Sequence, residues 1–203
     1  MTRKLPLALA GAAILSLGFA MPAGAQKTET AIFAGGCFWC VESDFDHLSG
    51  VLDTTSGYIG GKAENPTYYD HEGFREAVRV TYDPSKVTYD KLLDVFWHSV
   101  DPTDGGGQFC DRGHAYTTAI YATSGAQLKE AKASEAAVKQ DLGTVATEVT
   151  TAPKFWDAEG YHQDYYKKNP LKYKFYRTGC GRNARVEKVW GNKAYMGIKD
   201  HMG

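Results

Sequence analysis

The chain has 203 residues, of which 43% are hydrophobic, 13% aromatic and 23% charged, and its formal net charge is -1. This is the composition of an ordinary globular protein, and it excludes collagen-like, low-complexity and wholly disordered chains. The near-neutral charge gives no excess of basic side chains for the phosphates of DNA or RNA, so nucleic-acid binding is not expected.

The first 25 residues have the pattern of a cleavable export signal. Arg3 and Lys4 precede an apolar run over 7–19, and the Ala-Gly-Ala at 23–25 supplies the small residues that signal peptidase accepts. The run is shorter than the roughly 20 residues of a membrane span, and no later segment offers one. The sequence therefore predicts a signal peptide over 1–25 and a single domain over 26–203, exported to a bacterial periplasm or secreted, with no membrane attachment after cleavage. The alternative is an uncleaved N-terminal anchor.

Hydrophobic spacing predicts alternating strands and helices through the rest of the chain. Strands are expected over 28–34, 51–59, 76–82, 116–122 and 145–151, and helices over 38–48, 89–100, 124–142, 161–168 and 184–190. Ser124 and Gln127 have the spacing of a capped helix start. This order favours an α+β fold: a two-layer α/β sandwich with a mixed, mostly antiparallel sheet and a ferredoxin-like core, followed by a long irregular C-terminal tail.

The four cysteines all lie in the predicted mature chain: Cys37, Cys40, Cys110 and Cys180. In an exported protein one interpretation is a binding module held by two static disulfides. The segment around Cys37 favours another, because a strand ends, two glycines turn the chain, and the cysteine comes at the start of a helix. A helix N-terminus stabilises a thiolate, so we expect the pKa of Cys37 to lie below about 8.5. Cys37 is therefore the predicted nucleophile, beside an aromatic wall of Phe38 and Trp39.

Cys37 and Cys40 also have the spacing of thioredoxin-like redox sites, so an exported thiol–disulfide oxidoreductase is a second interpretation. Glu76 bears on the choice. Strand alternation places it on the inward face, where burial raises the pKa of a carboxyl and lets it act as a general acid. The other interpretation is a solvent-exposed strand-end residue paired with Arg75 or Arg79. Thiol–disulfide exchange would leave an inward Glu76 without a role.

The segment Gly36-Cys37-Phe38-Trp39 resembles the motif of the A-type peptide methionine sulfoxide reductases, the MsrA family. Eight further blocks stand in family order: 56–58 with 60–61, 65–68, 76–78, 82–84, 96–97, 101–103, 111–113 with 116, and 161–165 with 169–170. The resemblance spans roughly 31–191, which is nearly the whole predicted mature chain.

The resemblance implies a role for each matching residue. Cys37 matches the nucleophile that attacks the sulfur of methionine sulfoxide, and Glu76 matches the acid that protonates its oxygen. The other matching residues form the substrate pocket: Tyr68 and Tyr116 hold the oxygen, Asp111 is a polar residue of the same pocket, and Phe38 and Trp39 receive the methyl group. The resemblance implies that the enzyme acts on the S epimer alone, because a fixed methyl pocket opposite fixed oxygen donors accepts only one configuration at sulfur. His162, in the last family block, is expected near the site.

After methionine leaves, a second thiol must condense with the sulfenic acid on Cys37. The resemblance favours Cys180, in the predicted tail, as this resolving cysteine. Cys40, one helical turn from Cys37, and Cys110, beside Asp111, remain alternatives. The resemblance implies thiol chemistry without metal, flavin or nicotinamide, a thioredoxin-like protein as reductant, and methionine sulfoxide in proteins or peptides as substrate. We expect a monomer.

Overall fold

The computed structural model of this chain describes Met1 and residues 27–198. Apart from Met1, the predicted signal peptide over 1–25 lies outside the described residues. Within the described part of the chain, no helix is both long and apolar enough to cross a membrane.

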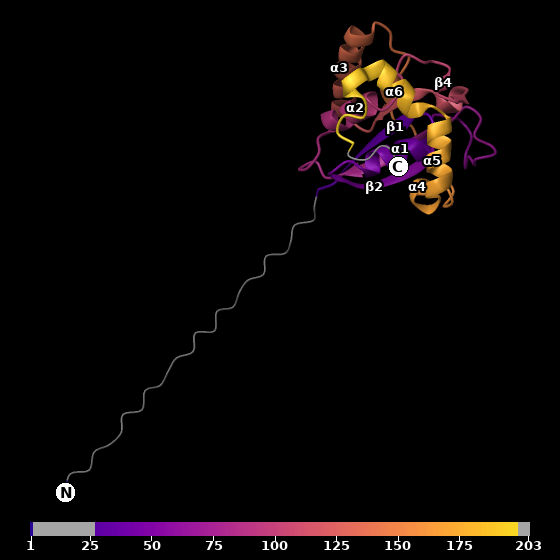
Figure 1. The fold of residues 1–203 in the computed structure, drawn as a ribbon. Helices are drawn as coiled ribbons and strands as arrows, with labels where there is room; N and C mark the ends of the chain where they lie inside the picture. The colour runs from indigo at the N-terminus through magenta and orange to yellow at the C-terminus, as the bar shows by residue number, and fades with distance from the viewer. Residues whose placement is uncertain (2–26, 199–203) are drawn as a thin grey trace.

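A six-stranded mixed sheet with the order β7-β6-β1-β3-β2-β8 forms the centre of the fold (Figure 1). Its strands are β1 (Glu29–Gly35), β2 (Val51–Ile59), β3 (Arg75–Tyr82), β6 (Thr118–Ala122), β7 (Glu148–Thr151) and β8 (Phe155–Asp157). Neighbouring strands are antiparallel except β6 and β7, which are parallel. The inner order β6-β1-β3-β2, with α1 (Phe38–Asp46) after β1 and α2 (Tyr89–Trp97) after β3, is a ferredoxin-like arrangement. The predicted α+β class and core are therefore confirmed.

Three helices, α1, α2 and α3 (Gly125–Leu142), cover one face of the sheet and bury the main core. The ring of Phe33 on β1 stacks on Phe45 of α1 at 4.9 Å and on Phe96 of α2 at 5.1 Å. Alternation along β1 turns its other residues to the opposite face, where a smaller cluster packs. Ser124 caps α3 as predicted, because its side chain accepts a hydrogen bond from the Gln127 N–H.

The C-terminal region, predicted as an irregular tail, is mostly helical. It contains α4 (Tyr165–Lys168), α5 (Pro170–Gly179) and α6 (Arg182–Trp190), so the helix expected over 161–168 begins later and α5 was missed altogether. The physical reason is that α5 buries only Tyr173 and Arg177. The inward face includes an arginine, and the apolar side chains Leu171 and Phe175 are exposed, so the apolar residues of this segment do not mark its buried face.

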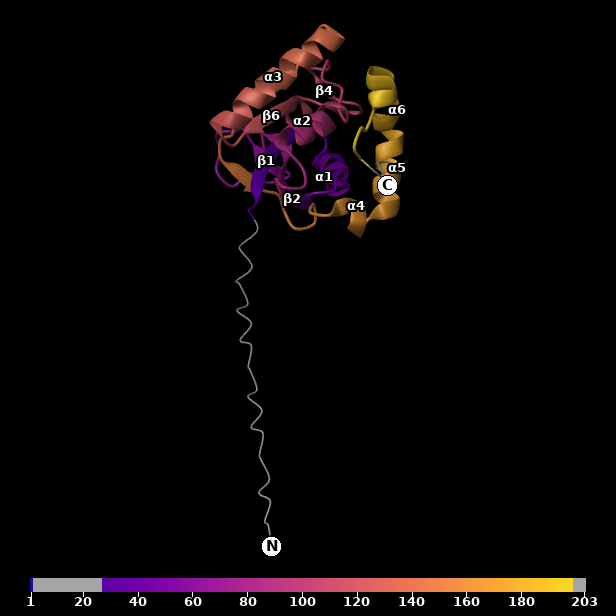
Figure 2. The ribbon, with the colours of Figure 1, turned by 90° about the vertical axis from the view of Figure 1, so that its left-hand side faces the viewer.

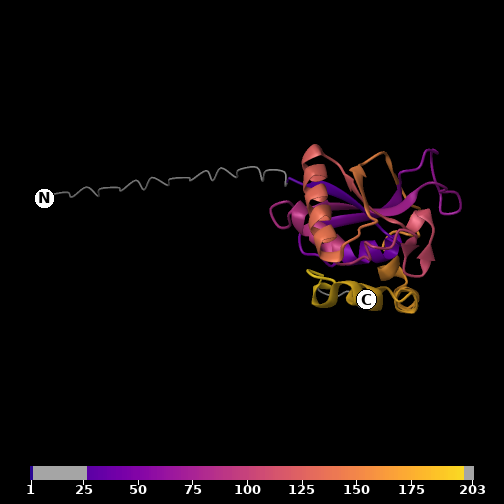
Figure 3. The same ribbon diagram turned by 90° about the horizontal axis from the view of Figure 1, so that it is seen from above.

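The C-terminal helices pack on the side of α1 that faces away from the sheet (Figures 2 and 3). Helix α1 is consequently buried on both sides, and even Asp44 is 1% exposed. Its carboxylate is paired with Arg177 of α5 at 2.8 Å and lies 3.5 Å from Arg182 of α6. The remaining short elements are the strands β4 (Gly107–Gln108) and β5 (Asp111–Arg112) and the 3-10 helices η1 (His114–Tyr116) and η2 (Gly191–Lys193).

Candidate active site

Cys37 lies where β1 gives way to α1. Gly36 has a φ of +85°, which glycine adopts at little cost, and a Cβ on it would lie 2.7 Å from the Cβ of Gln108. The chain turns at this point, and Cys37 becomes the N-cap residue of α1. The predicted strand, glycine turn and helix start are confirmed, and the Cys37 side chain is nearly enclosed, with 6% of its surface exposed.

Glu76 points from β3 toward the same helix start. It is buried, and its Oε2 atom accepts a hydrogen bond of 3.0 Å from the backbone N–H of Phe38. Burial raises the pKa of Glu76 to about 8, although the Phe38 hydrogen bond acts in the opposite direction. Of the two positions that strand alternation left open, Glu76 takes the inward one, and its carboxyl keeps its proton near neutral pH.

A pocket of about 60 Å³ joins these groups. It is lined by Cys37, Phe38, Trp39, Tyr68, Glu76, Asp111, Tyr116 and Tyr176. The first seven were all named from the sequence, so the structure brings the predicted nucleophile, acid and substrate-binding residues together. Burial is the main cause that raises the pKa of Tyr68 and of Tyr116, and both phenols therefore remain protonated hydrogen-bond donors.

Tyr176 is the pocket residue that the sequence analysis missed. It comes from α5, its hydroxyl donates a hydrogen bond to Oδ2 of Asp111, and it also interacts with the Cys37 sulfur. Its ring meets that of Trp39 edge-on, with centroids 5.7 Å apart. Nothing local marks this residue among the 13 tyrosines of the chain. The only available signal was its place one helical turn before Cys180.

Trp39 is held by aromatic neighbours from the C-terminal region. Its ring stacks on that of Tyr165 at 3.7 Å, and its indole N–H donates to Nδ1 of His162 at 3.1 Å. The His162 ring in turn packs against Phe38 and Tyr68, with centroids 4.9 and 4.7 Å apart. The expectation that His162 lies near the site is confirmed, and this ring network fixes the apolar wall beside Cys37.

The expected lowering of the pKa of Cys37 is wrong for this state of the protein. Burial raises the pKa of the Cys37 thiol, and so does the neighbouring Cys40, with which it shares a hydrogen bond. The Phe38 N–H at the helix start is bonded to Glu76 and is not free to stabilise a Cys37 thiolate. The hydrogen bond from Cys37, aided by the positive charges of Arg182 and Arg177, lowers the pKa of Cys40 to about 7.

The other two cysteines form a disulfide. Cys110 is bonded to Cys180, with Cα atoms 5.0 Å apart, whereas Cys37 and Cys40 are free thiols. Cys110 is exposed and directly precedes Asp111 of the pocket, while Cys180 follows α5 as its C-cap residue. Both sulfur atoms lie 3.8 Å from carboxylate oxygens of Asp111. The disulfide therefore adjoins the pocket on the solvent side.

Known proteins with similar sequences identify the family of this chain. The sequence model of the family described as "Peptide methionine sulfoxide reductase" matches residues 29–194. The chain belongs to this family. It is similar to Peptide methionine sulfoxide reductase MsrA 2 of Rhizobium meliloti, with 56% identity over 88% of this chain and 91% of the relative. It is also similar to MsrA of Bacillus subtilis, with 46% identity over 83% of this chain and 99% of the relative.

Solved structures of the same family share the fold. Methionine sulfoxide reductase A of Corynebacterium diphtheriae superposes with a TM-score of 0.69 and 33% identity, over 73% of this chain and 78% of the other. Mxr1 of Saccharomyces cerevisiae in reduced form superposes with a TM-score of 0.67 and 30% identity, over 75% and 91% of the two chains. Mxr1 has also been solved in complex with Trx2, and that structure shares the fold at 24% identity and a TM-score of 0.51, over 72% and 91% of the two chains. This member of the peptide methionine sulfoxide reductase family is an oxidoreductase.

Proposed function

We propose that this reductase reduces the S epimer of methionine sulfoxide, free or in proteins and peptides, and so repairs oxidised proteins. The observation that carries this assignment is the enclosed Cys37 thiol in one pocket with a carboxyl that is protonated near pH 7. A sulfoxide oxygen leaves only when it is protonated, so a sulfur nucleophile beside a neutral acid is the pair that the reaction requires.

In the first step the Cys37 sulfur attacks the sulfoxide sulfur while Glu76 transfers its proton to the oxygen. Tyr68 and Tyr116 donate hydrogen bonds to that oxygen, and Asp111 completes the polar side of the pocket. Phe38 and Trp39 enclose the methyl group, so that one sulfur configuration fits. The S–O bond breaks as the Cys37 sulfur bonds to the substrate sulfur, and the oxygen leaves as water with the protons of the Cys37 thiol and Glu76. Water then attacks the Cys37 sulfur, the bond to the substrate sulfur breaks and releases methionine, and one proton returns to Glu76. The net reaction turns a thiol and a sulfoxide into a sulfenic acid on Cys37 and a thioether.

In the second step Cys180 condenses with the sulfenic acid, forming a Cys37–Cys180 disulfide and releasing water. Cys110 then attacks the Cys180 sulfur, which frees Cys37 and forms the Cys110–Cys180 disulfide. The free Cys37 and the bonded Cys110 and Cys180 of the structure support this order, because they are the products of the last exchange. Cys40 is the competing resolving residue, since its pKa of about 7 and its hydrogen bond to Cys37 suit it to the same condensation.

A thioredoxin-like protein then reduces the Cys110–Cys180 disulfide, and the exposure of Cys110 supports this role. The relative Mxr1 is known in a complex with Trx2. The alternative hypothesis of a thiol–disulfide oxidoreductase is not favoured. Cys37 and Cys40 are only 6% and 2% exposed, so the disulfide of another protein has no access to them. No metal, flavin or nicotinamide is needed at any step, and we assign the enzyme as a monomer.

An experiment tests the activity directly. The protein over 26–203 is incubated with dithiothreitol and a racemic methionine sulfoxide peptide, and the two epimers are followed by chiral chromatography. We expect only the S epimer to disappear and Cys37→Ser to abolish the reaction. Consumption of the R epimer, or full turnover by Cys37→Ser, would contradict the assignment. Disulfide mapping after one turnover without reductant, in Cys110→Ser and in Cys180→Ser, identifies the resolving residue. We expect a Cys37–Cys180 bridge in Cys110→Ser, whereas a Cys37–Cys40 bridge there, or a Cys37–Cys110 bridge formed at the wild-type rate in Cys180→Ser, would contradict the choice of Cys180.

We further propose that the chain is exported and that residues 1–25 are removed. The basic head, apolar run and small residues before Gln26 support this. Expression of the full chain in a Gram-negative host, followed by fractionation and mass spectrometry, tests it. A periplasmic product that begins at Gln26 is expected, whereas a cytoplasmic product that retains residues 1–25 would contradict the proposal.

A further inference from the structure

Two cysteines and a carboxylate meet on the solvent side of the pocket. The potential ligand atoms of Cys110, Asp111 and Cys180 all lie within 4.8 Å of one another. Each of the two sulfur atoms is 3.8 Å from a carboxylate oxygen of Asp111. Reduction of the Cys110–Cys180 disulfide leaves two thiols beside this carboxylate. The reduced protein therefore presents two sulfur ligands and one oxygen ligand at a single point of its surface.

The distances suit a metal ion with tetrahedral coordination. Zn²⁺ binds cysteine sulfur at about 2.3 Å and carboxylate oxygen at about 2.1 Å, so two ligands of one tetrahedral ion lie roughly 3.6–3.8 Å apart. The sulfur–oxygen distances of 3.8 Å already have this spacing. The Cα atoms of Cys110 and Cys180 are 5.0 Å apart. Once the bond between the sulfur atoms is broken, rotation about the Cα–Cβ bonds lets them separate to the spacing that a shared ion requires.

The Asp111 carboxylate is already oriented for such a role. Tyr176 donates a hydrogen bond to Oδ2 of Asp111, which leaves Oδ1 for an ion. Hydrogen bonds of this kind orient the ligands of protein-bound metals. Two thiolates and one carboxylate carry one negative charge more than Zn²⁺ supplies. The positive charge of Arg182, which acts on Asp111, offsets the excess.

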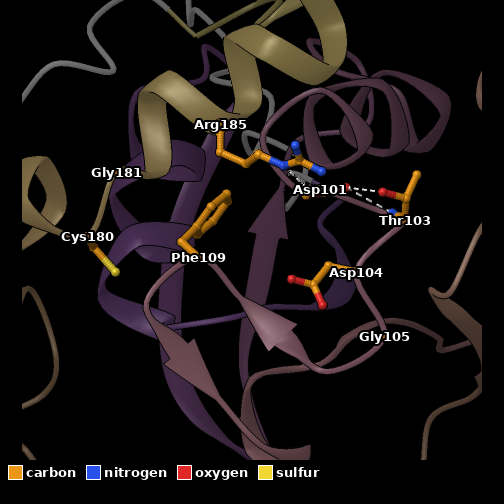
Figure 4. Close-up of a pocket in the computed structure, with 8 residues that line it drawn as sticks. All are labelled: Asp101, Thr103, Asp104, Gly105, Phe109, Cys180, Gly181 and Arg185. Atoms are coloured by element: carbon orange, nitrogen blue, oxygen red, sulfur yellow. Dashed lines mark hydrogen bonds and ion pairs between the residues drawn. The ribbon is translucent and has the colours of Figure 1, made fainter.

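The cluster is open to solvent on one side. Cys110 is exposed, and Cys180 lines a hollow of about 520 Å³ that it shares with Phe109, Asp104 and Arg185 (Figure 4). An ion can enter from this side, and a water molecule can complete the tetrahedral shell as the fourth ligand. Three protein ligands with an open fourth position differ from the closed four-ligand set of a structural zinc site, so the ion remains exchangeable.

We propose that the reduced form of this protein binds one Zn²⁺ ion through Cys110, Asp111 and Cys180, and that the ion withholds both thiols from the recycling of Cys37. Binding displaces two protons, one from each thiol, and transfers no electron. Formation of the Cys110–Cys180 disulfide removes both sulfur ligands and releases the ion. The binding is independent of the proposed function, whereas the effect on recycling rests on it.

The binding experiment first removes the other two thiols. The double variant Cys37→Ser/Cys40→Ser over 26–203 keeps Cys110 and Cys180, and it is prepared with the disulfide intact and, separately, reduced, with the reductant removed under nitrogen. Zn²⁺ is titrated in competition with a chromophoric chelator, and Co²⁺ serves as a probe because its charge-transfer absorption reports thiolate ligands. We expect one Zn²⁺ per reduced chain, thiolate absorption with Co²⁺, and neither in the oxidised form.

Further substitutions in the same background test the ligands one at a time. Asp111→Asn is expected to weaken zinc binding by the reduced form at least tenfold, and Cys110→Ser at least a hundredfold. The matched control Asp104→Asn replaces another carboxylate of the hollow beside Cys180 and is expected to change the affinity less than twofold. No binding by the reduced protein, equal binding by the two redox forms, or an affinity that Asp111→Asn and Cys110→Ser leave unchanged would overturn the site.

A second experiment measures the effect on recycling. Reduced Cys40→Ser is mixed with one equivalent of the S-sulfoxide peptide, with or without Zn²⁺ and without reductant, and is then treated with dimedone, which labels sulfenic acids. We expect a labelled Cys37 only with zinc, because neither recycling thiol is then free to condense with it. Equal labelling with and without zinc would overturn this effect. Failure of the zinc-free protein to form methionine would instead contradict the proposed function and leave the zinc site standing.

Discussion

The hydroxyl of Tyr176 donates a hydrogen bond to Asp111, and one helical turn further along α5 Cys180 is bonded to Cys110, the neighbour of Asp111. A hydrogen bond and a disulfide therefore both connect the C-terminal end of α5 to the Cys110–Asp111 segment. Together they hold the Tyr176 ring in the pocket beside Cys37. The pocket beside the ring is small, about 60 Å³, and Tyr176 forms part of its wall. We therefore expect Tyr176 to move when the methionine sulfoxide side chain enters.

We expect the disulfide to control substrate binding through Tyr176. In a Cys37→Ser background, which binds but does not react, the form with the Cys110–Cys180 disulfide should bind an S-sulfoxide peptide at least tenfold more weakly than the reduced form. Tyr176→Ala should abolish this difference because it vacates the pocket. Isothermal titration calorimetry measures both. The control Phe175→Ala, on the exposed side of α5, should keep the difference, and equal affinity of the oxidised and reduced forms with Tyr176 in place would contradict the prediction.

We expect the activity to fall as the pH rises through about 8, because Glu76, whose pKa is raised to about 8, loses the proton it must transfer. Glu76→Gln keeps an acceptor for the Phe38 N–H but has no proton to give, so its kcat should fall by about 10² to 10⁴. Its residual activity should also lack the decline near pH 8. A pH profile of single-turnover rates with the sulfoxide peptide checks this. If the rate of Glu76→Gln still declined near pH 8, the decline would belong to a group other than Glu76.

The same raised pKa predicts a stability effect. In the unfolded chain Glu76 ionises near its ordinary pKa of 4.5, whereas in the folded protein it stays protonated up to about pH 8. The folded state therefore loses stability as the pH rises between these values, by on the order of 3–5 kcal/mol. Glu76→Gln should remove this loss and unfold at a higher denaturant concentration than wild type at pH 8 but not at pH 4.5. Chemical denaturation at the two pH values checks it, and equal midpoint shifts would contradict it.

Removing Cys110 should separate the two kinds of reductant. In Cys110→Ser the disulfide stays between Cys37 and Cys180, in the enclosed part of the site, where a protein thiol has poor access. Thioredoxin-supported turnover should fall at least tenfold, with dithiothreitol-supported turnover falling much less. Cys40→Ser is the matched control and should change both rates less than twofold. A loss in Cys40→Ser as large as in Cys180→Ser would make Cys40 the resolving residue.

The buried ion pairs between α1 and the helices α5 and α6 should contribute more to the free energy of unfolding than ion pairs on the surface. Asp44, Arg177 and Arg182 are each at most 2% exposed. Asp44→Asn leaves two buried guanidinium groups without their carboxylate and should lower the free energy of unfolding by about 3–5 kcal/mol. By contrast, Asp141 and Lys193 form an ion pair in which the two side chains are 57% and 55% exposed. Asp141→Asn breaks this pair and should lower the free energy of unfolding by less than about 1 kcal/mol. Urea denaturation of both variants tests the contrast, and similar losses would contradict it.

Local patterns in the sequence predicted most of the fold and the reactive centre. Alternation along 76–82 put Glu76 on the inward face, and the glycines before Cys37 predicted the turn into α1. Both follow from the backbone geometry of a few neighbouring residues, which the sequence contains. The strand expected from 116 begins at Thr118, because 114–116 form a 3-10 turn, and such boundaries depend on contacts beyond the local pattern.

What the sequence by itself determined is therefore which residue types stand at the strand ends and helix starts around Cys37 and Glu76. The tertiary structure alone decided that the pKa is raised for Cys37 and lowered for Cys40, that Cys110 is bonded to Cys180, and that Tyr176 lines the pocket. The physical reason is the same in all three cases. Burial, hydrogen bonding and nearby charge set a pKa or bring side chains together, and here they come from α5 and α6, which are distant in the chain and adjacent to α1 only after folding.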